Sequence, residues 1–398
     1  MKFNIWEDCP KVPITELLSF IVDNRGKTVP TANDGWKLIA TNCVTNNTLF
    51  PVYEKVRYLT QETYETWFRA HPMPGDILFV NKGTPGRVCM VPDPVDFCIA
   101  QDMIALRADD KKIYNKYLFA VLRSREIQQQ IYNTNVGDVI PHFKKQFMDQ
   151  LLIPVPDRKI QEKIGNLYYQ LSYKVELNKK INENLFEQMQ ALYKAWFVNF
   201  KPFNGKQPES WHRDNIYSLA KIIYGAPFAS KQFNTERNGT PIIRIRDLKE
   251  QQFTTYTTES HPKGYLLQPG DIVIGMDGEF RPYIWGNDKA WLNQRVCVFD
   301  NIRPEGKAFL YFTIKPLLYA IEQTQVATTV IHIGKKDFDA FEVLVPEDTV
   351  LDKFDAITSP MIKQIVSNNF ENKYLASLRD TLLPKLMSGE IDISAINL

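Results

Sequence analysis

The sequence predicts an α/β (α+β) protein with two tandem, pseudo-two-fold-related domains separated by a long antiparallel two-helix coiled coil. Three observations lead to this fold class. Short motifs recur in the same order in both halves of the chain. Each half ends in a long helical stripe of apolar residues. The 398 residues, 44% of them apolar, are enough to fill two separate cores.

The repeat begins with strand-forming segments. Gly35-Trp-Lys-Leu-Ile-Ala-Thr-Asn resembles Gly239-Thr-Pro-Ile-Ile-Arg-Ile-Arg, in which a glycine precedes an alternating, β-rich run. Pro74-Gly-Asp-Ile-Leu-Phe-Val matches Pro269-Gly-Asp-Ile-Val-Ile-Gly, a turn that leads into a buried strand. These pairs predict the same strands at the same places in two copies of one domain.

Later motifs keep this order. Ile99-Ala-Gln-Asp-Met corresponds to Leu292-Asn-Gln-Arg-Val, and Val139-Ile-Pro-His-Phe-Lys-Lys-Gln-Phe corresponds to Val330-Ile-His-Ile-Gly-Lys-Lys-Asp-Phe. The separation between equivalent residues falls steadily, from 204 at the first pair (239−35) to 191 at the last (335−144). An unchanged order with a steady drift indicates one ancestral unit that was duplicated and then gained or lost loop residues.

A long helix is expected at the end of each half. In the first half, Asp157 is a suitable N-cap, and apolar residues follow at three- and four-residue steps from Ile160 to Val175 and then from Ile181 to Trp196. The second stripe runs from Met361 to a stop near Gly389. This spacing is typical of a coiled-coil stripe.

The length of the stripes favours packing of one helix on the other. A helix over 157–200 would be about 65 Å long, which exceeds what a compact domain can cover. Two such stripes can bury each other as an antiparallel pair, whereas the alternative is that each packs on its own domain. Because proline cannot continue a regular helix, Ser359-Pro360 is expected to start the second helix or to mark a kink.

Two asparagines interrupt the stripes at equivalent positions, Asn178 and Asn368 (368−178 = 190). In an antiparallel pair related by a pseudo-two-fold axis, equivalent residues meet only at the axis. We therefore expect Asn178 and Asn368 to face each other near the crossing. A buried polar residue of this kind fixes the register of a helix pair.

These observations divide the chain into four segments. The first domain covers 1–156, the central helix 157–200, the second domain 201–348, and the C-terminal helix and tail 349–398. The segment that begins Lys201-Pro-Phe-Asn-Gly-Lys-Gln-Pro has the proline, glycine and polar content of a linker.

Composition limits the function classes. The sequence has no apolar run near the 20 residues or so that span a bilayer, so a cytoplasmic protein without a membrane partner is expected. The five cysteines and five histidines show no metal-ligand spacing, so no metal site is expected. The net charge of +2 is too small to indicate or exclude nucleic acid.

Along essentially its whole length the chain resembles the specificity subunits of type I restriction-modification enzymes. The residues that carry the resemblance are the repeated Pro-Gly-Asp-Ile strands, Gly275-Met-Asp-Gly-Glu-Phe followed by Leu292-Asn-Gln-Arg-Val, Ile153-Pro-Val-Pro, Gln190-Ala-Leu-Tyr-Lys-Ala-Trp-Phe-Val-Asn-Phe and Thr381-Leu-Leu-Pro-Lys-Leu-Met-Ser-Gly-Glu. Their joint order is the specific signal. Pro360 is the main departure, and it puts the regularity of the second helix in question.

The resemblance implies a bacterial or archaeal DNA-binding protein without a catalytic centre. Each half would be a target recognition domain, and the paired helices would act as a ruler between them. The implied partners are double-stranded DNA, two modification subunits that transfer methyl groups, and restriction subunits that complete the endonuclease. No cofactor is expected on this chain, because S-adenosylmethionine and ATP would bind the partner subunits only. Since the segments between the motifs differ, the target should be split and non-palindromic.

Side chains able to discriminate bases gather after the two Gly-Asp-Ile strands. The first loop offers Asn81, Lys82, Thr84 and Arg87, and the second offers Asp277, Glu279, Arg281 and Tyr283. We expect contacts to bases from these loops, although ordinary solvated turns would show the same composition.

Further cations are candidates for phosphate contacts. Arg244 and Arg246 alternate along the expected strand Ile242-Ile-Arg-Ile-Arg, so both should point to one face. Lys144-Lys145 and Lys335-Lys336 recur at equivalent positions. They suit phosphate contacts that position the protein on DNA without specifying the base sequence. A salt-bridged surface strand and solvated lysines at helix starts are the alternatives.

Other functions fit the sequence less well. An amino-methyltransferase needs an Asn/Asp-Pro-Pro-aromatic loop and a glycine-rich cofactor turn, and Gly83-Thr-Pro-Gly86 is only GxxG. Pro92-Asp93 with Asp110-Lys-Lys112 matches a nuclease pattern, but the second part is expected in a turn. The remaining alternative is a coiled-coil interaction scaffold without base readout.

Overall fold

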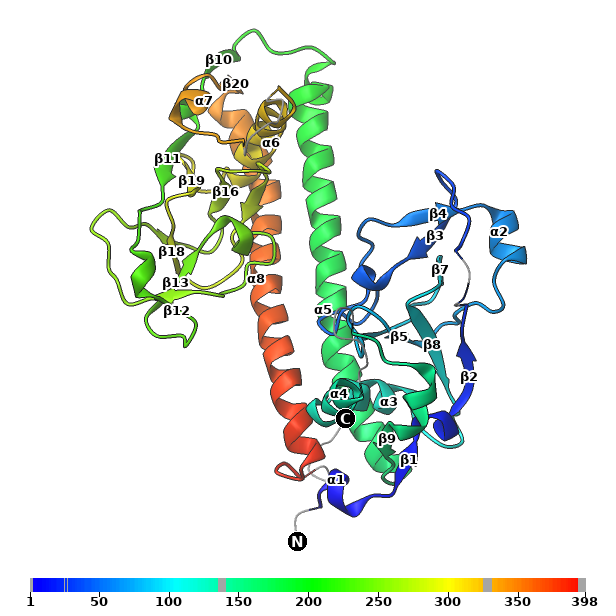
Figure 1. The fold of residues 1–398 in the computed structure, drawn as a ribbon. Helices are drawn as coiled ribbons and strands as arrows, with labels where there is room; N and C mark the ends of the chain where they lie inside the picture. Colours follow the sequence, from blue (N-terminus) through cyan, green and yellow to red (C-terminus); the bar gives the residue numbers. More distant parts are fainter. Residues whose placement is uncertain (1–2, 25, 27, 135–140, 325–330, 393–398) are drawn as a thin grey trace. The chain divides into compact units, whose positions relative to one another are not determined.

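The computed structural model describes residues 3–24, 26, 28–134, 141–324 and 331–392. The chain divides into two compact units: unit 1 comprises Met1–Leu177 and Lys373–Leu398, and unit 2 comprises Asn178–Asn372. Each unit contains a strand-rich domain and part of both long helices, α5 (Arg158–Tyr193) and α8 (Asp348–Met387) (Figure 1).

Unit 1 is built from short strands and short helices. They are β1 (Lys11–Pro13), β2 (Leu18–Val22), β3 (Trp36–Ile39), β4 (Arg57–Leu59), β5 (Ile77–Val80), β6 (Val88–Met90), β7 (Phe97–Ile99), β8 (Met103–Ala108), β9 (Leu152–Pro154), α1 (Ile5–Asp8), α2 (Gln61–Thr66), α3 (Asn115–Leu122) and α4 (Arg125–Asn133). One sheet has the order β2-β8-β5-β6, a second has the order β4-β3-β7, and β1 pairs with β9.

Unit 2 is likewise built from short strands and helices. They are β10 (His212–Asn215), β11 (Ala220–Tyr224), β12 (Phe233–Asn234), β13 (Thr240–Ile243), β14 (Tyr256–Thr257), β15 (Leu266–Leu267), β16 (Ile272–Gly275), β17 (Pro282–Ile284), β18 (Ala290–Leu292), β19 (Val296–Asn301), β20 (Glu342–Val345), α6 (Lys307–Thr324) and α7 (Lys335–Asp339). The sheets have the orders β11-β19-β16-β17 and β12-β14-β13-β18-β15, and β10 pairs with β20.

The central strands of the sheets share one topology in the two units, and unit 2 adds β12 and β15 at the edges of its second sheet. The order β2-β8-β5-β6 corresponds strand by strand to β11-β19-β16-β17, and β4-β3-β7 corresponds to β14-β13-β18. Each unit also contains one parallel pair among its otherwise antiparallel named strands. These pairs, β3 with β7 and β13 with β18, occupy equivalent places. The tandem repeat and the mixed α/β class predicted from the sequence are thereby confirmed.

The repeated Pro-Gly-Asp motif has a local structural role in both units. Gly75 and Gly270 adopt φ values of +86° and +88°, which a residue with a Cβ adopts only with strain. The following aspartates, Asp76 and Asp271, each accept a hydrogen bond from the backbone N–H three residues earlier. In unit 1 the Asp76 carboxylate also binds Arg107 of β8 at 2.8 and 2.9 Å. The motif therefore closes the turn that leads into β5 or β16.

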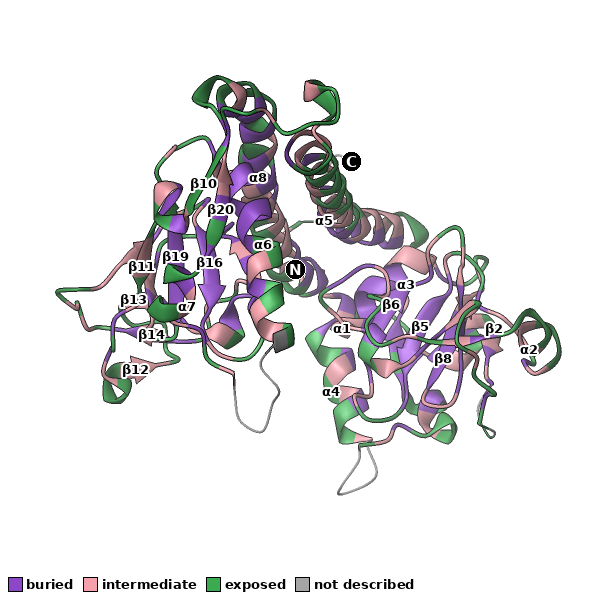
Figure 2. Ribbon diagram, turned by 90° about the horizontal axis from the view of Figure 1, so that it is seen from above, coloured by how far each residue is buried: buried purple, intermediate pink, exposed green. Residues whose placement is uncertain are grey.

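Each domain has its own hydrophobic core, and the strands at its centre are buried (Figure 2). In unit 1 the core between the main sheet and α3 also includes Ile164 of α5 and Leu386 of α8. In unit 2 it includes Met189 of α5 together with Phe354 and Ile365 of α8. Both long helices therefore contribute side chains to both cores.

The central helix lies where the sequence predicts it. Helix α5 covers Arg158–Tyr193 and continues through a π-helical turn, Lys194–Val198. The predicted cut points at 156, 200 and 348 separate helices from strand-rich segments, whereas the compact units cut across both helices near their middles. Among the described residues, no helix combines the length and the apolar character needed to cross a membrane.

The register of the helix pair differs from the prediction. Asn178 donates to Asn372 Oδ1 (2.9 Å) and to Glu371 Oε2 (2.7 Å). Asn368 donates to Asn182 Oδ1 (2.7 Å). Residue numbers rise along α5 as they fall along α8, so the helices run antiparallel here. The expected direct pairing of Asn178 with Asn368 is wrong, because each binds the asparagine one turn beyond the other.

This pattern keeps the expected symmetry. The repeat spacing of 190 relates Asn178 to Asn368 and Asn182 to Asn372, so the two hydrogen-bonded pairs are equivalent to each other. Two contacts take the place of the single one that was predicted. Asn182 also donates to Asn369 Oδ1 (2.9 Å), which adds a further bond across the helices.

Pro360 lies inside helix α8, which is continuous from Asp348 to Met387, so the expected helix start at this residue is wrong, and the alternative of a kink stays a prediction. The proline is exposed, and together with Ala356 and Ser359 it lines an open pocket of about 620 Å³. The carbonyl of Ala356, which would accept from an N–H at position 360, therefore has access to water. Solvent can satisfy this carbonyl, and packing on the opposite side holds the helix together.

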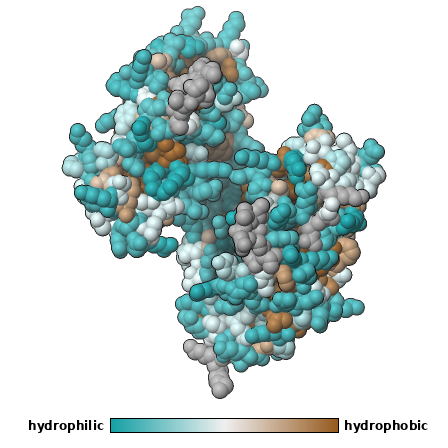
Figure 3. Space-filling view, viewed as in Figure 1, coloured by the Kyte–Doolittle hydropathy of each residue, from teal (hydrophilic) through white to brown (hydrophobic). Residues whose placement is uncertain are grey.

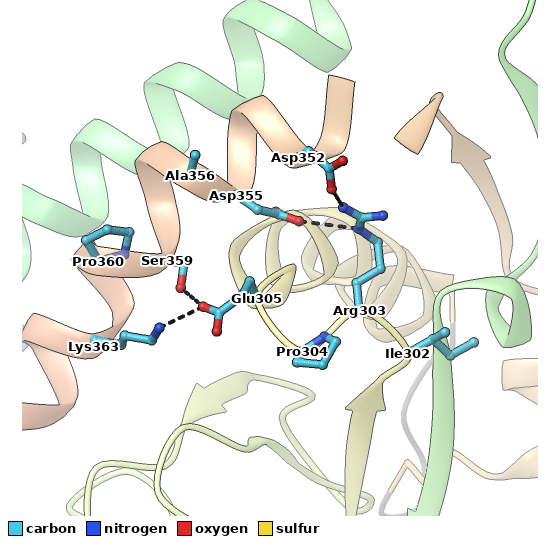
Figure 4. A pocket seen from close by; sticks show the side chains of 10 residues that line it. All are labelled: Ile302, Arg303, Pro304, Glu305, Asp352, Asp355, Ala356, Ser359, Pro360 and Lys363. Atoms are coloured by element: carbon cyan, nitrogen blue, oxygen red, sulfur yellow. Dashed lines mark hydrogen bonds and ion pairs between the residues drawn. The ribbon is translucent and has the colours of Figure 1, made fainter. Parts of the chain in front are cut away.

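The loop that precedes α6 is tied to α8 beside this pocket (Figure 4). Arg303 binds Asp348 (2.7 Å), Asp352 and Asp355 (3.3 Å). Glu305 binds Ser359 and Lys363. Burial raises the pKa of Asp355, and the Arg303 guanidinium opposes that shift. The contacts join successive turns of α8 to the domain on both sides of Pro360.

Replacing Asn182 with alanine should destabilise the protein. The buried amide of Asn368 would lose its acceptor, which costs about 1–3 kcal/mol. Urea unfolding followed by circular dichroism measures the change. Asn184→Ala is the matched control, because Asn184 is exposed on the same helix and its loss should change stability by less than about 0.5 kcal/mol. Equal effects of the two substitutions would exclude a role for the asparagine contacts.

Replacing Pro360 with alanine should stabilise the protein by about 1–2 kcal/mol. An interior helical proline costs about 3 kcal/mol, and the greater freedom of the unfolded chain offsets part of the gain. Urea unfolding measures the stability of Pro360→Ala, and Pro304→Ala is the control. Pro304 is an exposed loop proline beside the same pocket, and its replacement should lower the free energy of unfolding slightly. A destabilised Pro360→Ala protein would mean that α8 needs the proline.

Candidate nucleic-acid interface

The candidate interface lies where the hairpin loops β5–β6 and β16–β17 meet two other segments of the same unit. In unit 1, Asn81 N donates to Asp102 O (2.8 Å), and Asn81 O accepts from Phe143 N (2.8 Å). Gly83 N donates to Pro141 O (3.0 Å). The hairpin loop, the turn before β8 and the segment after 140 are thus joined by backbone hydrogen bonds.

Unit 2 repeats this arrangement. Met276 N donates to Arg295 O (2.9 Å), Met276 O accepts from Ile333 N (2.9 Å), and Gly278 N donates to Ile331 O (2.9 Å). We call these bonds the loop frame of each unit. Lys82 pairs with His142 in an isolated β-bridge, and Asp277 pairs with His332 in the same way. The frame therefore places equivalent residues at equivalent positions in the two units.

The frame brings several predicted residues of unit 1 together. Lys82 and Arg87 are exposed and Thr84 is half-buried. Lys144 and Lys145 follow the bridging segment and are exposed, and Lys145 pairs with Asp23 at 3.4 Å. Of the predicted segment that begins at Val139, residues 139 and 140 lie outside the described residues. The predicted cations of unit 1 thus share one end of the sheet.

Asn81 is a correction to the predicted contacts. It is fully buried, its Nδ2 donates to Phe143 O (3.2 Å), and its Oδ1 has no partner among the described residues. The equivalent residue in unit 2, Met276, is buried as well. The position supports the frame from inside, so its side chain is not available to a base.

In unit 2 the predicted residues have different surroundings. Asp277 binds His332 (2.6 Å), and Glu279 is exposed. Arg281 makes a two-point ion pair with Glu322 of α6, and this hydrogen bonding raises the pKa of Arg281. Tyr283 is half-buried in β17 opposite Val273 of β16. Of the four residues predicted in this loop, only some can therefore exchange their present contacts for a DNA contact at low cost in free energy.

The lysine pair of unit 2 stands at the start of α7. Lys335 binds both carboxylate oxygens of Asp339 at 2.8 Å and lies over the ring of Tyr217. Lys336 is exposed beside it. The equivalent pair in unit 1 begins a 3-10 turn, so both pairs stand at a helical start next to the frame.

Arg244 and Arg246 do not share a strand face, which corrects another prediction. Strand β13 ends at Ile243, and Ile245–Asp247 forms a 3-10 turn. Arg244 binds Asp247 and Thr255, whereas Arg246 is exposed. The Asp247 carboxylate accepts from the Arg244 N–H and closes the turn, so a local hydrogen bond ends the strand where alternation predicts its continuation.

Two residues of unit 2 were missed by sequence reasoning. Arg295 and His332 are exposed beside Asp277, with Arg295 Nη1 3.3 Å from His332 Nδ1 and 3.7 Å from Asp277 Oδ1. Both belong to repeated motifs in which the equivalent residues are Asp102 and His142. For Arg295 the signal was the change from Asp to Arg directly after the glutamine that the two motifs share.

The surface that carries these side chains is polar. On the face drawn in Figure 3, hydrophilic residues cover most of each unit and hydrophobic patches are small. Among the described residues, no three His, Cys, Asp or Glu side chains gather as metal ligands. The chemistry that the frame offers is therefore hydrogen bonding and charge.

Two copies of one α/β domain, each displaying its own polar side chains on a common backbone frame, define a two-site recognition protein. The model of the family described as type I restriction modification DNA specificity domain matches residues 11–187 and 208–367. The chain belongs to this family, since the match covers more than half of its length.

Relatives agree with this assignment. The chain is 22% identical over 305 residues to the specificity subunit of the type I restriction enzyme MjaIX from Methanocaldococcus jannaschii, with 71% of each chain covered. It is 32% identical over 189 residues to the EcoBI specificity subunit from Escherichia coli, covering 47% of this chain and 35% of that one. The S subunit structure from M. genitalium shares the fold, with a TM-score of 0.56 and 17% identity over 97% of this chain and 98% of that chain.

Family membership confirms the resemblance noted in the sequence. It favours DNA recognition over the scaffold alternative. Specificity subunits are non-catalytic, and catalysis takes place on partner subunits. DNA, methyltransferase subunits and restriction subunits are therefore the partners that the family implies.

Replacing Asn81 with methionine, the residue at the equivalent position of unit 2, tests whether this side chain has only a structural role. The lost hydrogen bond to Phe143 O costs about 1 kcal/mol, and burial of the larger apolar side chain offsets part of it. The free energy of unfolding measured with urea should change by less than about 1 kcal/mol. The DNA bases preferred by the complex should stay the same. A changed base preference would show that Asn81 reaches the DNA.

Proposed function

We propose that the chain reads a split, non-palindromic DNA target, one half-site with each unit, for two modification subunits and for restriction subunits. The observation that carries the proposal is the loop frame, which is the same in both units, while the side chains mounted on it differ. Lys82, Thr84 and Arg87 occupy the loop of unit 1. In unit 2, Asp277 and Glu279 take the places of Lys82 and Thr84, whereas Arg281 keeps the arginine of position 87. Different donors and acceptors at matching places give the two units different surfaces for base recognition.

Phosphate contacts supply affinity in this proposal. Lys144 and Lys336 are exposed beside the frame and can neutralise phosphates without reading sequence. Lys145 is exposed there too, but it would first have to leave Asp23. Lys335 would have to exchange Asp339 for a phosphate, so its contribution is smaller. A net charge of +2 is sufficient, because partner subunits that close around the duplex supply further positive charge.

The two-fold repeat also suggests the partner ratio. Each unit presents a half of α5 beside a half of α8, so one modification subunit per unit gives two in the complex. We propose that this chain binds no cofactor of its own and that S-adenosylmethionine and ATP are held by the partners. Asn178 and Asn368, with Asn182 and Asn372, are proposed to fix the register of the helix pair.

Selection from a randomised duplex pool by the complex with modification subunits tests this function. The natural complex should select two separate blocks of defined sequence with a gap of fixed length. Arg87→Ala should relax one block and leave the other intact, because Arg87 belongs to unit 1 alone. Sequencing of the bound DNA gives the base preference at each position.

Lys111→Ala is the matched control. Lys111 is an exposed cation of unit 1 that follows the far end of β8, away from the loop frame, and its loss should leave both blocks unchanged. Selection of no motif by the natural complex would refute DNA reading. Equal relaxation of both blocks by Arg87→Ala would refute the assignment of one half-site to each unit.

A further inference from the structure

One backbone position of the loop frame carries an arginine in unit 2 and an aspartate in unit 1. The carbonyl of Arg295 accepts from Met276 N (2.9 Å), and the carbonyl of Asp102 accepts from Asn81 N (2.8 Å). The two residues thus have the same place relative to the hairpin loop of their unit. Their side chains have opposite charge. The backbone position is therefore the same in the two units, whereas the charge that it carries differs.

The charge difference is matched at a second position of the frame. Lys82 of unit 1 corresponds to Asp277 of unit 2, and each bridges to an equivalent histidine. Unit 1 therefore has a lysine and an aspartate at these two positions, and unit 2 has an aspartate and an arginine. An exchange of charge at matched places is expected where the two copies recognise different ligands.

The backbone around Arg295 is held on several sides. Asn293 N donates to Ile243 O (3.2 Å), and Asn293 O accepts from Val296 N (2.9 Å). Gly225 packs so closely that a Cβ there would lie 2.0 Å from the carbonyl oxygen of Asn293. The turn that carries Arg295 therefore has little freedom to shift, and its side chain starts from a fixed point.

The guanidinium of Arg295 is both exposed and oriented. The side chain is 56% exposed, and its Nη1 lies 3.7 Å from Asp277 Oδ1 and 3.3 Å from His332 Nδ1. Asp277 in turn binds His332 at 2.6 Å. Arginine has five N–H donors in a rigid plane, and the Asp277 carboxylate approaches this plane on the Nη1 side. His332 Nδ1 donates to the Asp277 carboxylate, so it is not an acceptor for the guanidinium. A carboxylate at one edge thus orients the plane while the side chain remains open to solvent.

Arg281, the arginine predicted from the sequence, is less available. Both of its Nη atoms bind Glu322, and its guanidinium lies over the ring of Tyr319. Contact with a base would require this two-point ion pair to break. Arg295 needs no such change, so it is the better candidate within the same unit.

We propose that Arg295 reads a guanine in the half-site of unit 2 and that Asp277 positions the arginine instead of binding a base itself. The proposal rests on the proposed function. Guanine presents two neutral acceptors, N7 and O6, in the major groove, which match a bidentate arginine. The Asp277 carboxylate beside the guanidinium would repel a phosphate, so this arginine favours a base edge over the DNA backbone.

The test uses duplex selection by the complex with modification subunits. Arg295→Ala should lower the preference for guanine at one position of one block by roughly 5- to 150-fold and leave the other positions unchanged. Arg295→Lys should retain affinity but lose this preference, because lysine is a point charge without the planar fork. Arg213→Ala, an exposed arginine of unit 2 on β10, should change nothing.

Asp277→Asn separates positioning from direct contact. If Asp277 is a positioning residue, Asp277→Asn should weaken the base preference at the same base pair that Arg295→Ala affects, and at no other. Loss of preference at a different base pair would show that Asp277 itself reads DNA and would overturn its positioning role.

The outcomes keep the two proposals apart. If the natural complex selects no motif, DNA reading itself is refuted. If it selects a split motif and Arg295→Ala lowers overall affinity with every preference kept, Arg295 binds phosphate and the guanine assignment is overturned. If Arg295→Ala changes neither the selected motif nor the affinity for DNA, the guanine assignment is overturned as well. Circular dichroism of the variants should match the natural protein, since the Arg295 side chain is mostly exposed.

Discussion

Each long helix is shared between two hydrophobic cores, and this sharing is the constraint on which the rest of the structure depends. Helix α5 contributes to unit 1 through its first half and to unit 2 through its second, and α8 does the reverse. The buried side chains that do this are Ile164, Tyr168, Leu383 and Leu386 in unit 1, and Met189, Leu351, Phe354 and Ile365 in unit 2. Burial of such a side chain contributes about 1.5–3 kcal/mol. Neither domain therefore completes its core with one helix alone.

The sequence predicted this organisation because apolar periodicity and repeated motif order are local signals. They were sufficient for the repeat, the fold class and the central helix. Pro360 was misjudged because the rule for proline concerns one hydrogen bond, whereas helix α8 is also held by Phe354 and Ile365 and by the ion pairs of Arg303. Tertiary packing on one face outweighed a local penalty on the exposed face.

The candidate interface was less predictable, because a polar residue in a loop can face inward. Asn81 was chosen for its amide, yet it lies under the loop with its backbone in the frame. Arg244 was chosen for strand alternation, yet Asp247 draws it into a turn. Arg295 was passed over, although its motif was in view, because only the fold brings it beside Asp277. Residue type was predictable from sequence, and orientation required the tertiary contacts.

The loop frame also explains how one fold can serve different recognition surfaces. Its bonds join backbone N–H and C=O groups, so they persist whichever side chains the residues carry. Lysine and aspartate can therefore stand at 82 and 277, and aspartate and arginine at 102 and 295, without a change in the frame. Positions 81 and 276 differ, because their side chains are buried beneath it and must fit the core. Variation is consequently least costly where the side chains point outward, which is where a ligand is met.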